Sequence, residues 1–344
     1  MLVFGAKASA QDNDNHVLST LRTEARADFE TNGGDYGFVG RYFNLHAGGQ
    51  LGDKFSYYFR HRIITTTSEP SLFDNTDFLH LTYKINDNWS LRAGKDALAV
   101  GGYEYDAAPI DVLFNGVYWD NFYCFQMMGR VMYKTNDGNH NIWAEVGASP
   151  YINTTALNPA HWKSGLMSYN LFWSGSFGHF HTLYSVNFFE YERGRAMNYI
   201  ALGNKVQYEK WGLYLDLMHH AFATDDWGKN FGIVSRFDYD INGSWKLFLK
   251  GSYEQNRSNY PFNMAGTYDC LVPEHHTFGL YGGGFEFRPA SCKSVRLHGF
   301  VAYREDKDYT PTGNPYAEIP VASSSLSVNF GLSWNMDFMK MINK

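Results

Sequence analysis

The chain has 344 residues, a formal net charge of −6 and an unusually high share of aromatic residues, 18%. The acidic balance argues against a nucleic-acid partner, which would favour a basic face. No stretch approaches the roughly 20 apolar residues of a transmembrane helix, which excludes a helical membrane protein. With 33 Gly and a mean hydropathy of −0.39, the composition is typical of a membrane β-barrel with a wet interior. A large soluble all-β protein is the alternative.

The first residues indicate the compartment. Residues 1–10 end in Ala8, Ser9 and Ala10, a small-residue motif of the kind that signal peptidase cuts, which makes Gln11 the mature start. The usual basic segment is missing and the apolar run is short. We therefore predict that 1–10 is a signal-peptide remnant clipped at its front; the alternative is an ordinary disordered N-terminus.

From residue 18 onward, apolar and polar residues alternate with period two, which predicts one β-strand after another. The first strand places five charged side chains on one face, which requires water there: Arg22, Glu24, Arg26, Asp28 and Glu30. Sixteen strands are predicted at about 18–30, 36–49, 54–66, 76–86, 88–97, 122–134, 140–149, 164–175, 178–190, 197–209, 211–223, 229–241, 244–256, 276–288, 293–305 and 322–338. Residues 11–344 are thus predicted to form a single domain.

The second predicted strand, 36–49, has one misplaced charge. The phase that turns Phe43 and Leu45 outward also turns Arg41 toward lipid, where a cation is costly. A β-bulge near Gly40 would switch the phase and bring Arg41 inward. We therefore expect a bulge at this position.

The links between the predicted strands alternate in length. Links after even-numbered strands are short, whereas links after odd-numbered strands are mostly longer. Tight turns at one rim and long loops at the other are typical of a bacterial outer-membrane barrel, and a soluble sandwich has no reason to sort its loops in this way. Trp89, Trp211 and Trp245 each follow a short link closely, where an aromatic girdle would lie.

The link 97–121 is the longest and is the candidate for narrowing the lumen. Sixteen strands enclose a water-filled channel unless something fills it. The link contains the pair Gly101 and Gly102 among small residues, which would let its backbone fold against the wall. We expect it to fold inward and to carry Glu104, Asp106 and Asp111 to the pore constriction. A surface-exposed loop is the alternative.

The last predicted strand, 322–338, has the clearest alternation. Its apolar positions are Leu326, Val328, Phe330, Leu332, Trp334, Met336 and Phe338, and small or polar residues stand between them. One face would meet lipid and the other would line the lumen. The first and last strands should pair, because unpaired edge groups in lipid are costly.

Two short segments carry a family resemblance. The run Leu91 to Lys95 (LRAGK), followed by Gly101 to Glu104 (GGYE), resembles the strand and inward loop of the phosphate-selective porin O and P family, and the neighbouring strand from Phe78 to Tyr83 (FLHLTY) agrees with it. The resemblance implies a bacterial outer-membrane channel without a cofactor. It also implies a homotrimer, surrounded by outer-membrane lipid and lipopolysaccharide, that passes small hydrophilic solutes.

The chain departs from the family pattern at the constriction. Phosphate-selective members carry lumen arginines and lysines there, whereas residues 96–121 contain no Lys or Arg. By strand phase, a basic wall faces the loop acids: Arg22, Arg26, Arg60, Arg62, Arg92 and Arg130. Opposite signs across a constriction predict weak charge selectivity, neutral to mildly cation-preferring, without a saturable phosphate site.

Other functions remain open at this point. An outer-membrane hydrolase would need a Ser, a His and an acid converging at one rim, and a subunit of a larger surface assembly would purify with other proteins. The pair His219 and His220 beside Asp216 is not expected to form one centre, because adjacent strand residues face opposite sides. Cys124, Cys270 and Cys292 do not form a metal pattern. We predict no metal, no nucleic acid and no catalysis.

Overall fold

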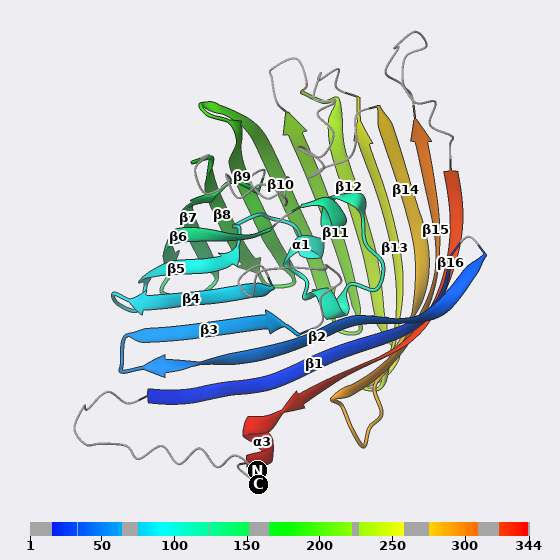
Figure 1. The fold of residues 1–344 in the computed structure, drawn as a ribbon, viewed down its shortest axis with the longest axis horizontal. Helices are drawn as coiled ribbons and strands as arrows, with labels where there is room; N and C mark the ends of the chain where they lie inside the picture. The colour runs from blue at the N-terminus through cyan, green and yellow to red at the C-terminus, as the bar shows by residue number, and fades with distance from the viewer. Residues whose placement is uncertain are drawn as a thin grey trace.

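The computed structural model describes residues 16–32, 34–63, 75–122, 124–150, 165–221, 227–257, 275–308 and 323–342. These form a closed antiparallel barrel of sixteen strands, in which every strand pairs with its neighbours in sequence and β1 pairs with β16 (Figure 1). The fold class, the strand count and the closure predicted from the alternation are confirmed. No helix in this part of the chain is long and apolar enough to cross a membrane.

The strands lie close to their predicted positions. They are β1 (His16–Asn32), β2 (Asp35–Leu51), β3 (Phe55–Arg62), β4 (Thr76–Lys84), β5 (Trp89–Ala97), β6 (Phe125–Lys134), β7 (His140–Ala148), β8 (Met167–Phe177), β9 (Phe180–Glu192), β10 (Arg195–Tyr208), β11 (Trp211–Ala221), β12 (Asn230–Asp240), β13 (Trp245–Asn256), β14 (His276–Phe287), β15 (Val295–Asp308) and β16 (Ser323–Asp337). A short helix, α3 (Phe338–Ile342), follows the last strand. The expected signal-peptide remnant 1–10 and Cys270 lie outside the described residues.

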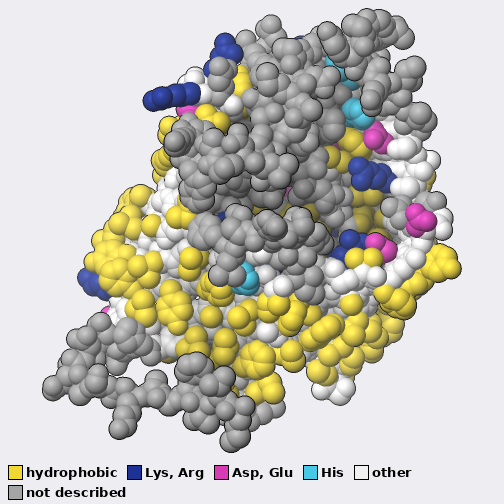
Figure 2. Space-filling model, viewed as in Figure 1, with side chains coloured by type: hydrophobic (Ala, Val, Ile, Leu, Met, Phe, Trp, Pro, Cys, Tyr) yellow, Lys and Arg dark blue, Asp and Glu magenta, His cyan; other side chains and the backbone are white. Residues whose placement is uncertain are grey.

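The two faces of β16 show how the alternation builds the wall. Leu326 and Phe330 are more than half exposed on the outside of the barrel, whereas Asn329 between them is fully buried within it. Asn329 donates its side-chain amide to Asp28 on β1 at 3.1 Å. Figure 2 shows the outer face as a broad band of hydrophobic side chains. Such a face suits contact with lipid, and the polar alternates suit a wet lumen.

The predicted bulge in β2 is present. Arg26 pairs with Tyr42 while Ala27 pairs with Gly40, so Arg41 is the extra residue. Its guanidinium forms an ion pair with Glu30 and lies 3.5 Å from the Asp28 carboxylate. The bulge therefore turns Arg41 toward acids of β1 instead of lipid, because one added residue reverses the side-chain phase.

The links sort onto the two rims as expected. The links after even-numbered strands are short, whereas most of those after odd-numbered strands are long; 33–34 and 193–194 are the short exceptions. Trp89, Trp211 and Trp245 are each the first residue after a tight turn. At two of these turns an Asn side chain, Asn86 or Asn242, accepts the backbone N–H of the tryptophan. This Asx geometry closes the turn and places the ring at the rim.

Candidate functional site

The link between β5 and β6 runs through the interior of the barrel over its described residues, 98–122 and 124. It forms α1 (Tyr103–Asp106), a single 3-10 turn (Pro109–Asp111) and α2 (Val117–Asn121), which Figure 1 places inside the ring of strands. We call residues 98–124 the lumen loop. Its start is bonded to the wall: the Ala99 N–H donates to Glu145 Oε1 at 2.9 Å, and Asn187 Nδ2 donates to the Ala99 carbonyl at 2.8 Å.

Gly101 and Gly102 bring the lumen loop into backbone contact with β9 and β10. A Cβ at Gly101 would lie 2.4 Å from the carbonyl oxygen of Leu183, and a Cβ at Gly203 would lie 2.8 Å from the Gly102 Cα. Gly102 also has φ of 103°, a conformation that side-chain-bearing residues rarely adopt. Only glycine fits at these two positions of the loop, which explains the Gly pair that the sequence shows there.

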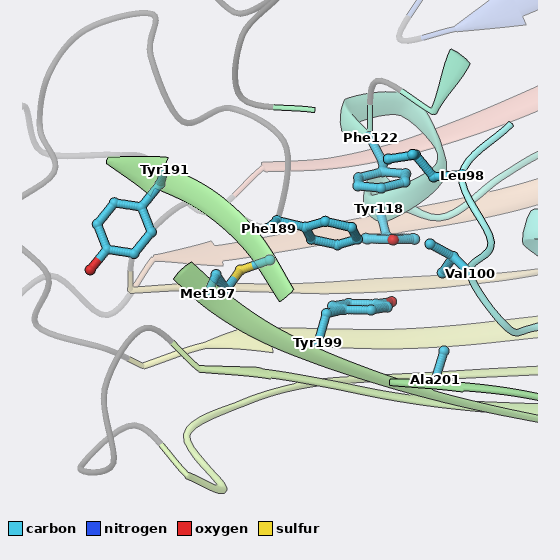
Figure 3. Close-up of a cluster of buried hydrophobic side chains, with 9 residues drawn as sticks. All are labelled: Leu98, Val100, Tyr118, Phe122, Phe189, Tyr191, Met197, Tyr199 and Ala201. Carbon is cyan, nitrogen blue, oxygen red and sulfur yellow. The ribbon is translucent and has the colours of Figure 1, made fainter. Parts of the chain in front are cut away.

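An aromatic cluster then holds the loop against β9 and β10 (Figure 3). Tyr118 of α2 stacks on Tyr199 of the wall with ring centroids 5.0 Å apart, and on Phe122 at 5.1 Å. Burial raises the pKa of the Tyr118 hydroxyl well above its ordinary value, so this ring remains neutral. Stacked rings contribute both buried area and a preferred geometry, and they fix this end of the loop.

A second apolar cluster seats the middle of the loop on β13 to β15. Phe114 packs between Phe248 and Phe300, with centroid distances of 6.1 and 5.1 Å. A Cβ at Gly282 would lie 2.9 Å from the ring edge of Phe114. The three consecutive glycines of β14 thus include one whose missing side chain makes room for a loop aromatic.

Two wall carboxylates accept hydrogen bonds from the backbone N–H groups of the loop helices. Asp216 on β11 accepts the N–H groups of Tyr103 and Glu104, both at 2.8 Å. Glu254 on β13 accepts those of Val117 and Tyr118, both at 2.9 Å. Neither helix has a side-chain cap of its own. The wall therefore supplies the capping carboxylates that free helix N–H groups require.

The three predicted constriction acids have different surroundings. Glu104 forms an ion pair with Lys250 of β13, and Asp111 lies 2.5 Å from Arg296 of β15. Asp106 is exposed to the interior, yet the surrounding barrel withdraws it from bulk water, and this desolvation raises the pKa of its carboxyl. Two of the three acids therefore already bind a wall cation.

Three arginines of the predicted basic wall, Arg26, Arg60 and Arg62, have acidic partners. Arg26 forms an ion pair with Asp28 at 2.7 Å and donates to the Val112 carbonyl of the loop at 2.8 Å. Arg60 and Arg62 share the Asp77 carboxylate, at 2.9 and 2.5 Å.

The remaining arginines follow the same pattern with one exception. Arg92 lies 2.8 Å from Asp96, and Arg130 lies 2.5 Å from Glu145. Arg22 makes no ion pair with any residue that the structure describes, and its Nε is buried without a hydrogen-bond partner. The basic wall is thus largely a set of ion pairs with acids of the same wall.

Four residues of the site escaped the analysis of the sequence: Lys250, Arg296, Glu254 and, as a loop anchor, Asp216. Each is a charged residue in the lumen-facing phase of a long strand, and that phase is the only signal the sequence carries for them. Lys250 and Arg296 lie 146 and 185 residues from their loop partners. No local pattern relates such distant residues.

The other candidate centres do not come together in the described part of the chain. His219 accepts the Gly228 N–H at 3.0 Å and stacks on Trp227, while its neighbour His220 stacks on Tyr199 on the opposite face. No group of three His, Cys, Asp or Glu among the described residues could hold a metal ion. Ser176 bonds His181 at 3.0 Å, but His181 makes no ion pair with a described acid.

Solved structures with the same architecture include an outer-membrane channel, an outer-membrane protein and an anion-selective porin. The channel DcaP of Acinetobacter baumannii superposes with a TM-score of 0.62 at 11% identity, covering 96% of this chain and 100% of that one. A trimer form of OmpT from Vibrio cholerae gives 0.61 at 12% identity, covering 93% and 99%. The anion-selective porin of Comamonas acidovorans gives 0.58 at 12% identity, covering 94% and 100%. At these identities the likeness establishes the fold.

The family is established by the sequence itself. Among curated protein sequences no match is found. The model of a protein family described as phosphate-selective porin O and P matches residues 21–228, which is more than half of the chain. The matched region runs from β1 to the end of β11 and includes the whole lumen loop. The chain therefore belongs to the phosphate-selective porin O and P family and is a porin of the bacterial outer membrane.

Proposed function

We propose that the lumen loop is the constriction through which small hydrophilic solutes and ions diffuse passively, with weak charge selectivity. A barrel of sixteen strands is wide enough for an aqueous channel, and the loop spans it from β7 to β15. Glu104, Asp106 and Asp111 stand on the loop. The process needs neither a chemical step nor a cofactor.

The pairing of lumen cations with acids carries this proposal. Arg60, Arg92 and Arg130 each lie within 3 Å of a carboxylate on the same wall. Lys250 and Arg296 are bound to acids of the loop. Rings of charge select by their sign, and a cation beside a carboxylate presents little net charge to a passing ion. The negative charge of the exposed Asp106 then gives the channel a mild preference for cations.

We also propose that this channel has no saturable phosphate site, although its family is named for phosphate selectivity. A phosphate site needs guanidinium or ammonium donors that point at the ligand. The donors of Arg26, Lys250 and Arg296 are instead hydrogen-bonded to loop carbonyls and to carboxylates. Phosphate would have to displace these intramolecular bonds.

Reversal potentials in planar bilayers test both statements. We expect a potential near zero, or slightly cation-preferring, in a potassium chloride gradient, and no loss of chloride current when millimolar phosphate is added. Sulfate at equal ionic strength controls for screening. Strong chloride preference together with block by phosphate would show that the arginines dominate the lumen.

We propose a homotrimer as the assembled form. The similar OmpT of Vibrio cholerae was solved in a trimer form, and the outer face of this chain is apolar over a broad band that lipid, lipopolysaccharide or another copy could cover (Figure 2). Light scattering of the detergent-solubilised protein should give a protein mass of three chains. A mass of one chain at all detergent concentrations would contradict it.

A further inference from the structure

The two carboxylates that cap the loop helices share one buried charge cluster. A Cβ at Gly116 would lie 2.2 Å from Glu254 Oε1 and 3.7 Å from a carboxylate oxygen of Glu104, so these two acids flank the same point of the backbone. Glu104 also accepts the Gly116 N–H at 3.1 Å. Asp216 binds the N–H of Glu104 itself. Three carboxylates therefore hold the two loop helices together and against the wall.

Among the residues that the structure describes, Lys250 is the one cation bonded to this cluster. It binds Glu104 and the Phe114 carbonyl. Glu254 is 1% and Asp216 2% exposed, so water screens them little. The titratable groups that face the cluster are Tyr103, Glu104, Tyr118, Tyr199, Lys205, Tyr214, His220 and Lys250. Three acids therefore share one bonded ammonium, and the cluster carries excess negative charge when all three are ionised.

We propose that Asp216 and Glu254 are positioning residues for permeation: their ionised carboxylates latch the lumen loop in the constricting position, and protonation in acid loosens it. The inference rests on the proposed role of the loop as the constriction. Each carboxylate uses both oxygens to accept a loop N–H. A protonated carboxyl turns one oxygen into a donor, which would face an N–H instead of accepting from it.

Isosteric amides imitate the protonated state without changing the packing. Asp216→Asn and Glu254→Gln each replace one acceptor by an NH₂ group that opposes a backbone N–H. The loop should leave its constricting position about tenfold more often, since a charge-assisted bond is lost and a buried donor is left unpaired. We expect larger and noisier single-channel currents at neutral pH, with faster passage of a bulky neutral oligosaccharide in a liposome swelling assay.

Asp238→Asn is the matched control. Asp238 is a buried lumen acid on β12 that pairs with Arg236 and Lys246 on the wall and makes no hydrogen bond or ion pair with the described residues of the loop. This variant should keep the current noise of the unmodified protein. Equal noise in all three variants would overturn the latch.

A pH series on the unmodified channel provides a test that needs no substitution. When the pH is lowered from neutral to about 4, the ordinary pKa of a carboxyl, current noise should rise several-fold. The double variant Asp216→Asn/Glu254→Gln should be noisy throughout and lose this pH dependence. A quiet, conducting protein over the whole range would refute the latch but leave the channel intact, whereas absence of any conductance would refute the proposed function.

Discussion

Two halves of the lumen wall use the same residue types differently. From β3 to β7, arginines pair with acids of neighbouring strands: Arg60 and Arg62 with Asp77, and Arg130 with Glu145. From β11 to β15, Lys250 and Arg296 pair with acids of the loop instead, although Asp238 still pairs with Arg236 and Lys246 on the wall. Apolar clusters flank the pairs with the loop. We call these the wall-paired half and the loop-bound half.

The difference shows what an ion pair does in each place. A wall–wall pair neutralises a charge inside a rigid sheet whose position hydrogen bonds already fix. A wall–loop pair also decides where a segment without a strand partner lies. Loss of one charge should therefore have electrostatic consequences in the wall-paired half and geometric consequences in the loop-bound half.

The largest effect is expected when an ion pair between wall and loop is removed from the loop-bound half. Lys250→Met removes the ammonium beside Glu104 while keeping a side chain that can pack on Phe114. Removal of one partner of a buried pair costs about 3–5 kcal/mol, and we expect this cost to appear as release of the loop. Single-channel conductance should rise, and the thermal unfolding midpoint in detergent should fall.

Arg60→Met is the counterpart in the wall-paired half. Arg60 is as buried as Lys250 and also lies 4.3 Å from the Phe78 ring. Because Asp77 retains Arg62 at 2.5 Å, the loss of stability should be smaller and the conductance unchanged. If Arg60→Met raised the conductance as Lys250→Met is expected to, the loop would be released in both cases and the two halves would not differ.

A smaller effect is expected at Arg92, where a substitution tests the electrostatic role of the wall-paired half. Arg92 is partly exposed, and its partner Asp96 keeps Arg130 at 3.4 Å. Arg92→Gln should change stability by only about 0–1 kcal/mol, as for other partly solvated pairs. It should nevertheless shift the reversal potential in a salt gradient toward cations, because the lumen becomes one charge more negative. A shift toward anions would contradict this charge assignment.

The smallest expected effect concerns pH and Asp106, the loop acid with no wall cation in the described residues. Desolvation raises the pKa of its carboxyl, so the group is neutral below that raised pKa and negative above it. Cation preference should therefore increase modestly as pH rises through this range. In Asp106→Asn the reversal potential should lose that component of its pH dependence. An unchanged pH profile in the variant would show that Asp106 does not face the ion path.

The local alternation of apolar and polar residues was sufficient to predict the strands of the wall and their two faces. Alternation along strands such as β16 predicted both faces, and the single misplaced Arg41 predicted the bulge beside Gly40. These features are readable because an antiparallel strand pairs with its sequence neighbour, so each decision depends on residues that are close in the chain. The lengths of the links then separated the two rims.

The partners across the lumen were decided only by the closed barrel. Nothing within β13 or β15 shows that Lys250 faces Glu104 or that Arg296 faces Asp111, since their alternation places them in the lumen but not opposite a particular loop residue. Those contacts depend on where the curvature of sixteen paired strands carries each side chain. The sequence by itself determined that the chain closes into a barrel with a polar interior, whereas the tertiary structure determined which of its charges remain available to a solute.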